Sequence, residues 1–73
     1  RVYRRIVQLS DVFGGSTAPV VLPLTQDDIA SMAGTTRQTV NAALKAAETA
    51  GLVQVGRGRV TILDLAGIAK LAR

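Results

Sequence analysis

The chain has 73 residues, nine Lys and Arg against five Asp and Glu, a net charge of +4, and neither Cys nor His. This length predicts one small domain held together by aliphatic packing, because no disulfide can form and zinc sites without Cys or His are rare. The absence of Cys and His also removes the usual nucleophiles and proton carriers, so we do not expect an enzyme or a metal site. No apolar run reaches the ~18 residues of a membrane span, and no secretory signal is visible.

The beginning of the chain predicts a helix followed by a short strand. Apolar residues recur at helical spacing over residues 1–13, at Val2, Ile6, Leu9 and Phe13. Gly14, Gly15, Ser16 and Thr17 interrupt this pattern, and Pro19 reinforces the break. The apolar run 20–22, which ends at Pro23, predicts the strand. The first residue is Arg rather than Met, so we expect an excised or trimmed domain.

Two helices are predicted on either side of Gly34. Thr25 and Asp28 form a capping-box pattern at the start of the first helix, and Gly34 is placed to end it. Thr36 is a plausible cap for the second helix, which we expect over 36–50. The expected inner faces are Ile29, Ala30 and Ala33 for the first helix, and Val40, Ala43, Leu44 and Ala47 for the second. Two helices joined by a glycine turn predict a helix-turn-helix.

After Gly51 the apolar period changes to two, which predicts a β-hairpin with its turn at 56–59. Asp64 then caps a last helix with an expected inner face of Leu65, Ile68, Ala69 and Ala72. The predicted order is helix, strand, helix, helix, strand, strand, helix. The fold class is therefore mainly helical α+β, and residues 1–73 are predicted to form one winged helix-turn-helix domain.

The second helix of the predicted pair carries side chains suited to reading bases. Arg can bind guanine O6 and N7, and Gln or Asn can bind adenine N6 and N7 in the major groove. Arg37, Gln38 and Asn41 supply these groups near the start of the helix, where a recognition helix contacts base edges. With Val40, Leu44 and Ala47 facing inward, these three residues and Lys45 are expected on the outer face of the helix. On a generic helix such a face would simply be solvated, but the surrounding motif favours contact with DNA.

Further residues are suited to contacting the DNA backbone. The hydroxyls of Thr36 and Thr39 lie where a helix start attracts phosphate, although Thr36 can also serve only as a cap and Thr39 only as a surface residue. Lys45 is either a phosphate contact or a solubilising charge. Arg57 and Arg59 at the hairpin turn are expected on phosphates, with the alternative of solvated charges that oppose aggregation.

Two further features of the first helix bear on the partner. Arg1, Arg4 and Arg5 either touch phosphates or pack against an upstream domain, and the sequence does not decide between these. The aromatics Tyr3 and Phe13 both lie in this helix, away from the recognition region. Proteins that bind single strands or RNA usually stack bases on aromatic side chains, so duplex DNA is favoured.

The stretch from Leu24 to Ile62 resembles the C-terminal DNA-binding domain of the Crp/Fnr family of bacterial transcription regulators. The resemblance rests on Leu-Thr-Gln-Asp-Asp-Ile-Ala at 24–30, Ala-Gly-Thr-Thr-Arg-Gln-Thr-Val-Asn at 33–41, Leu-Lys at 44–45 and Gly-Leu-Val at 51–53. By position, it implies that Arg37 and Gln38 touch bases and that Thr36 and Thr39 touch phosphate.

The resemblance also implies a longer parent protein. Its missing N-terminal part would be an effector-sensing β-barrel, often for a cyclic nucleotide, joined by a dimerisation helix; no cofactor is expected in the 73 residues themselves. The full-length protein is expected to act as a homodimer on a two-fold symmetric operator, with recognition helices ~34 Å apart. RNA polymerase is a further implied partner, no membrane partner is implied, and the implied location is the cytoplasm, at the nucleoid.

Two positions depart from the family pattern. Many members carry a second base-reading Arg at the position of Ala42, and several carry Glu at the position of Gln38. Ala42 can contact a thymine methyl but cannot form a hydrogen bond, and Gln favours adenine where Glu favours cytosine. The expected operator is related to the family half-site but differs from it.

Two other readings stay open. A winged helix that binds another protein and never touches DNA is compatible with the modest net charge of +4 and with Asp27 and Asp28 at the start of the first helix of the pair. A winged helix from a different regulator family would have the same chemistry and a different missing domain.

Overall fold

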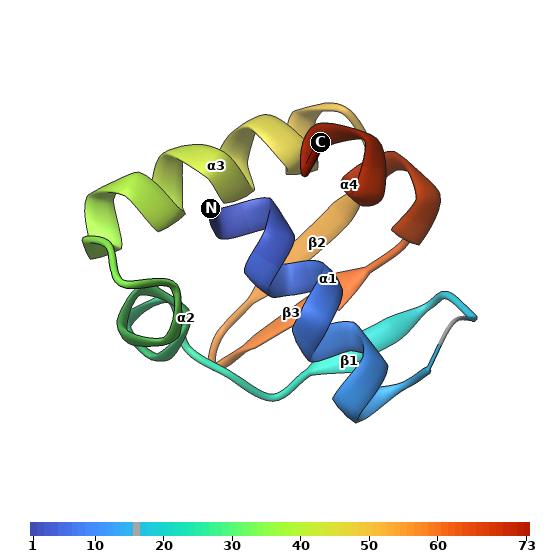
Figure 1. Cartoon of the computed structure of the whole chain (residues 1–73), viewed down its shortest axis with the longest axis horizontal. Coiled ribbons are helices and arrows are strands. Elements are labelled where there is room, and N and C mark those ends of the chain that lie inside the picture. The colour runs from blue at the N-terminus through green and yellow to red at the C-terminus, as the bar shows by residue number, and fades with distance from the viewer. Residues whose placement is uncertain (16) are drawn as a thin grey trace.

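The computed structural model describes residues 1–15 and 17–73 and contains the predicted elements in the predicted order (Figure 1). Ser16, in the predicted break after the first helix, lies outside the described residues. The elements are α1 (Val2–Phe13), β1 (Val20–Leu22), α2 (Gln26–Ala33), α3 (Arg37–Thr49), β2 (Val53–Gly56), β3 (Arg59–Ile62) and α4 (Leu65–Leu71). Mainly helical α+β architecture with a helix-turn-helix and a hairpin wing is confirmed.

The ends of α2 and α3 are fixed by the capping residues that the sequence indicated. The Thr25 hydroxyl accepts from the N–H of Asp28 at 3.0 Å, and the Asp28 carboxylate accepts from the N–H of Thr25 at 2.9 Å. Gly34 ends α2 in the left-handed conformation, with φ of +68°. Thr36 caps α3 by accepting from the N–H of Thr39 at 3.2 Å. These caps and the glycine turn together set where α2 stops and α3 starts.

The three strands form one antiparallel sheet in the order β1-β3-β2. In the hairpin, Gly56 lies opposite Arg59, so the loop consists of Arg57 and Gly58, and Gly58 has a φ of +67°. On its other side β3 pairs with β1, with Val21 opposite Thr61. The sequence predicted the β1 segment as a strand but carried no signal for its partner. β3, the strand that follows the wing turn, is therefore the central strand of the sheet.

A single aliphatic core joins the sheet to the helices. Helix α1 contacts α2, α3, α4 and β1, and it crosses in front of the sheet in the view of Figure 1. The fully or almost fully buried apolar side chains are Val2, Ile6, Val20, Leu22, Ile29, Ala30, Val40, Leu44, Ala47, Val53, Val60, Ile62 and Ile68. Burial of these side chains supplies the stability that the sequence assigned to aliphatic packing.

Parts of the predicted inner faces are wrong. Phe13 is 44% exposed, because it is the last residue of α1, and this end of the helix points away from α2, α3 and α4 (Figure 1). The buried stripe of α1 instead runs through Val2, Ile6 and Ser10, whose hydroxyl donates to the carbonyl of Val7 at 2.6 Å. Ala69 is exposed, since the short α4 buries only Ile68 fully.

Other predicted inner positions, namely Leu9, Ala33, Ala43, Leu65 and Ala72, are half-buried. In the part of the chain that is described, no helix is long and apolar enough to cross a membrane.

Candidate nucleic-acid interface

Helix α3 presents one polar face to solvent. Val40, Leu44 and Ala47 are buried, as the sequence predicted, so the helix is anchored along one side. Gln38, Ala42 and Lys45 are exposed on the opposite side. At 3.6 residues per turn, positions 38, 42 and 45 follow one another along a single face. This exposed face is the part of the helix-turn-helix that a groove could receive.

Arg37 and Asn41 lie on the side of α3 that faces α2. The guanidinium Nη1 of Arg37 is 3.4 Å from Oδ2 of Asp27, and both side chains are about two thirds exposed, at 67% and 68%. The Nδ2 of Asn41 donates to Oε1 of Gln26 at 3.1 Å. Asn41 is therefore half-buried and held by α2, so the prediction that it lies on the outer face is wrong: that position is turned toward α2. Contacts with α2 thus hold the Asn41 amide and the Arg37 guanidinium at the edge of the exposed face.

The two threonines at the start of α3 form a local pair. Thr36 Oγ1 lies 3.0 Å from Thr39 Oγ1 and accepts from the N–H of Thr39. The predicted capping role of Thr36 is confirmed, and Thr39 is its partner rather than an isolated surface residue. Both residues are exposed at the positively polarised end of the helix, which attracts anions.

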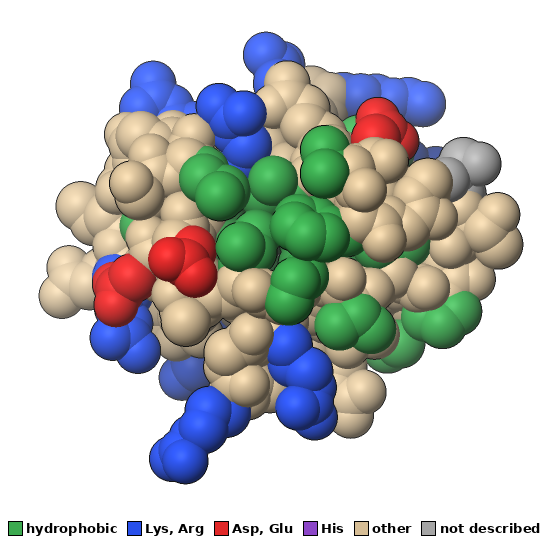
Figure 2. All heavy atoms as spheres, turned by 90° about the horizontal axis from the view of Figure 1, so that it is seen from below, with side chains coloured by type: hydrophobic (Ala, Val, Ile, Leu, Met, Phe, Trp, Pro, Cys, Tyr) green, Lys and Arg blue, Asp and Glu red, His purple; other side chains and the backbone are tan. Residues whose placement is uncertain are grey.

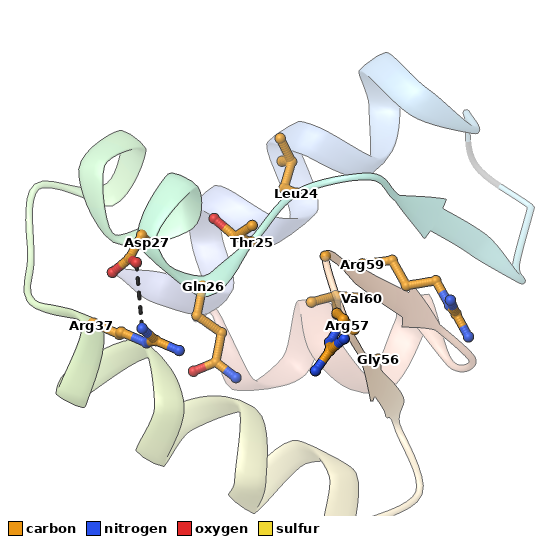
Figure 3. A pocket seen from close by; sticks show the side chains of 10 residues that line it. Leu24, Thr25, Gln26, Asp27, Arg37, Gly56, Arg57, Arg59 and Val60 are labelled. Carbon is orange, nitrogen blue, oxygen red and sulfur yellow. Dashed lines mark hydrogen bonds and ion pairs between the residues drawn. The ribbon is translucent and has the colours of Figure 1, made fainter.

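The wing tip meets the starts of α2 and α3 across an open pocket of about 400 Å³ (Figure 3). Gln26 and Asp27 line the pocket from α2, Arg37 lines it from α3, and Arg57 and Arg59 line it from the wing. In the view of Figure 3, Arg57 extends on the side of Gln26 and Arg37, whereas Arg59 extends away from them. The wing thus places the guanidinium group of Arg57 on the side of the polar edge of α3, while that of Arg59 points away from it.

A carboxylate joins the wing to α3. Oε2 of Glu48, near the end of α3, accepts from the backbone N–H of Val55 in β2 at 3.0 Å. Nothing in the sequence indicated this contact of Glu48, or the contacts of Gln26 and Asp27 with α3. The contacts of Gln26 and Asp27 depend on how α2 and α3 cross, for which the sequence contains no local signal.

The chain is similar to known proteins in both sequence and structure. The family model described as the Crp-like helix-turn-helix domain matches residues 1–71. A CRP-like cAMP-activated global transcriptional regulator of Mycobacterium tuberculosis is 36% identical over 76 residues, which cover 100% of this chain and 34% of the relative. The chain belongs to the CRP/FNR family of transcriptional regulators. The Crp/Fnr resemblance found in the sequence is thus confirmed.

Solved structures of the CRP/FNR family agree with this assignment. A CRP/FNR-family regulator from Thermus thermophilus is 30% identical, with a TM-score of 0.85 over 99% of this chain and 38% of its own. The CO-dependent transcription factor CooA from Carboxydothermus hydrogenoformans is 28% identical, with a TM-score of 0.79 over 100% of this chain and 35% of its own. The chain thus spans about a third of the length of the relatives that it matches.

Proposed function

We propose that this domain binds duplex DNA sequence-specifically, with α3 in the major groove. The observation that carries the proposal is the exposed face of α3, edged by Arg37 and Asn41 and flanked by the wing arginines across one pocket. An α-helix fits the major groove, and Arg, Gln and Asn can each form two hydrogen bonds with one purine. Arg37, Gln38 and Asn41 are the proposed base contacts.

The proposed backbone contacts surround this face. Thr36, Thr39 and Lys45 are exposed on α3, and Arg57 and Arg59 are exposed on the wing. Each of these side chains offers donors suited to phosphate oxygens. Such contacts position the helix without reading sequence, so their loss weakens binding to all duplexes alike.

The test is the affinity of the 73-residue chain for duplex DNA as a function of salt. Phosphate binding releases counterions, so a steep salt slope is expected, and Arg57→Ala/Arg59→Ala should lower it by about two. Arg37→Ala should cost about 1–3 kcal/mol and relax the preference at one base pair. An equal loss on every sequence would make Arg37 a phosphate contact. Binding that ignores salt would support a protein-binding winged helix instead.

Gln38 and Ala42 set the proposed operator apart from the family half-site. Both side chains are exposed on the outer face of α3. The Gln38 amide favours adenine, and the Ala42 methyl can contact a thymine methyl but forms no hydrogen bond. Selection of bound duplexes from a random pool tests this, and the return of an unchanged family half-site contradicts it.

For the parent protein we propose a dimeric regulator whose N-terminal β-barrel binds an effector, with a dimerisation helix between the two parts. The name of the Mycobacterium tuberculosis relative, which states activation by cAMP, supports a cyclic nucleotide as the first effector to try. A two-fold symmetric operator, RNA polymerase as a partner and action at the nucleoid in the cytoplasm complete this proposal. Calorimetry of the longer protein with cyclic nucleotides, and its mass in solution, test the effector and the dimer.

A further inference from the structure

A second basic group lies on α1, outside the proposed recognition surface. Arg1, Arg4 and Arg5, here called the α1 arginine cluster, line a pocket together with Gln8 of α1 and Ala33 of α2. All three arginines are exposed. The described structure pairs none of them with a carboxylate, since its one salt bridge joins Arg37 and Asp27.

The α1 arginine cluster is tied to the turn of the helix-turn-helix. Nη1 of Arg1 donates to the carbonyl oxygen of Gly34 at 3.2 Å. Farther along α1, the Tyr3 hydroxyl donates to the carbonyl of Ala43 in α3 at 2.8 Å. Through Arg1, the cluster therefore lies beside the turn that leads from α2 into α3.

The wing arginines lie at the other end of α2. Arg57 and Arg59 share their pocket with Gln26 and Asp27, the first residues of α2, whereas the α1 cluster shares its pocket with Ala33, the last. A helix of eight residues is ~12 Å long at 1.5 Å per residue. Seen from below, Lys and Arg side chains stand at two opposite edges of the molecule, with hydrophobic side chains between them (Figure 2).

The length of α2, which has a basic group near each end, is close to one dimension of the duplex. The major groove of B-DNA is ~12 Å wide and is bordered by one phosphate backbone on each side. If the start of α3 enters the groove with α2 lying across it, basic groups at the two ends of α2 are positioned to meet the two backbones. Guanidinium groups bind phosphate oxygens through paired N–H donors, and three on one helix face form a suitable site.

We propose that the α1 arginine cluster is a second phosphate-binding site, which grips the backbone opposite the one that the wing contacts. The inference rests on the proposed DNA binding and extends it to a helix that precedes the helix-turn-helix. Arg1 holds the cluster against Gly34, and Arg4 and Arg5 supply the outer donors. The DNA is then held from both sides of the groove, which fixes the rotation of α3 within it.

The test compares two double variants with equal charge loss. Arg4→Gln/Arg5→Gln should lower the magnitude of the salt slope for duplex binding by about two, since each phosphate contact contributes about 0.9. Lys70→Gln/Arg73→Gln removes two charges at α4, on the side of the molecule away from α2, and should leave the slope unchanged. Arg4→Lys/Arg5→Lys keeps the charge and should keep the slope, which guards against a folding defect in the Gln variant.

The outcomes separate this inference from the proposed function. Equal slopes for the unaltered chain and Arg4→Gln/Arg5→Gln would overturn the α1 site while leaving DNA binding by α3 intact. Equal reductions in the α1 and α4 variants would also overturn it, because the effect would then be one of net charge. If the unaltered chain does not bind duplex DNA even at low salt, the proposed function itself fails.

Discussion

Nδ2 of Asn41 donates to Oε1 of Gln26 at 3.1 Å, which joins the middle of α3 to the first residue of α2. The contact is partly buried and spans the turn of the helix-turn-helix. It fixes the direction in which the Asn41 amide can offer its remaining donor and acceptor. Gln26, a residue of α2, thereby orients the side chain of Asn41, which is a proposed base contact on α3.

Gln26→Ala should weaken both folding and DNA binding. Loss of a neutral hydrogen bond costs about 0.5–1.5 kcal/mol of unfolding free energy, and we expect a loss of binding of the same order because Asn41 is no longer oriented. Urea unfolding and fluorescence anisotropy with a selected duplex measure the two effects. Ser31→Ala, on an exposed position of the same helix, is the control. Unchanged binding in Gln26→Ala would show that the orientation of Asn41 does not matter for recognition.

Asp27→Asn should strengthen binding to duplex DNA of any sequence at low salt. The substitution removes a negative charge beside Arg37 and leaves the guanidinium free for DNA. Stability should change by less than about 1 kcal/mol, as is usual for exposed ion pairs. Titrations at several salt concentrations measure the effect. Asp11→Asn makes the same charge change on α1, and an equal gain there would assign the effect to net charge alone.

Asp28→Ala also removes one negative charge, from the residue after Asp27, but we expect it to destabilise the domain. Asp28 completes the capping box of α2 through the N–H of Thr25. Its loss should cost about 1 kcal/mol of unfolding free energy. Thermal unfolding followed by circular dichroism checks the difference between the neighbouring aspartates. Equal stability of Asp27→Asn and Asp28→Ala contradicts the assignment of the cap.

Gly34→Ala should destabilise the domain by about 1–2 kcal/mol, the cost of a left-handed conformation for a residue with a Cβ. A Cβ at Gly34 meets no heavy atom within 4 Å, so the cost comes from the backbone alone. Gly34→Asn should cost less, because Asn tolerates this conformation better. Denaturant unfolding of both variants provides the comparison. A larger loss in Gly34→Asn than in Gly34→Ala would rule out this explanation.

Glu48→Ala should loosen the wing. Without the carboxylate, the N–H of Val55 loses its acceptor in α3 and exchanges its proton faster. Glu48→Gln retains an acceptor oxygen and should preserve most of the protection, although it removes the charge. Amide hydrogen exchange at Val55, followed by NMR, distinguishes the variants. Equal protection in the unaltered chain and Glu48→Ala would mean that the hydrogen bond does not restrain β2.

The elements were predictable because their signals are local. Thr25, Gly34 and Thr36 each act within three or four residues, and the alternation of Val53 with Val55 needs no distant partner. The base-reading candidates followed from the residue types at the start of α3 and from the neighbouring helix, glycine turn and hairpin, all of which have local signals. Caps, turns and apolar periods each depend only on residues that are close together in the sequence, so they can be recognised without knowing the fold.

Contacts between elements were not predictable in the same way. The pairing of Asn41 with Gln26 depends on the crossing of two helices, and that of β1 with β3 depends on how the chain returns to the sheet. The exposure of Phe13 and Ala69 depends on where the neighbouring elements stop. Periodicity gives the angle of a side chain around its helix and contains no information on the extent of the surface it meets.

The pairing of Val21 with Thr61 closes a chain loop of about forty residues around α2 and α3. Its closure carries an entropic cost that only contacts distant in sequence can offset, which favours late, cooperative assembly. The helix-turn-helix is consequently not a detachable module: its geometry exists only when the segments before and after it are joined in the sheet. A peptide limited to α2 and α3 would lack both the closure and most of the core, and would not retain the angle between the two helices.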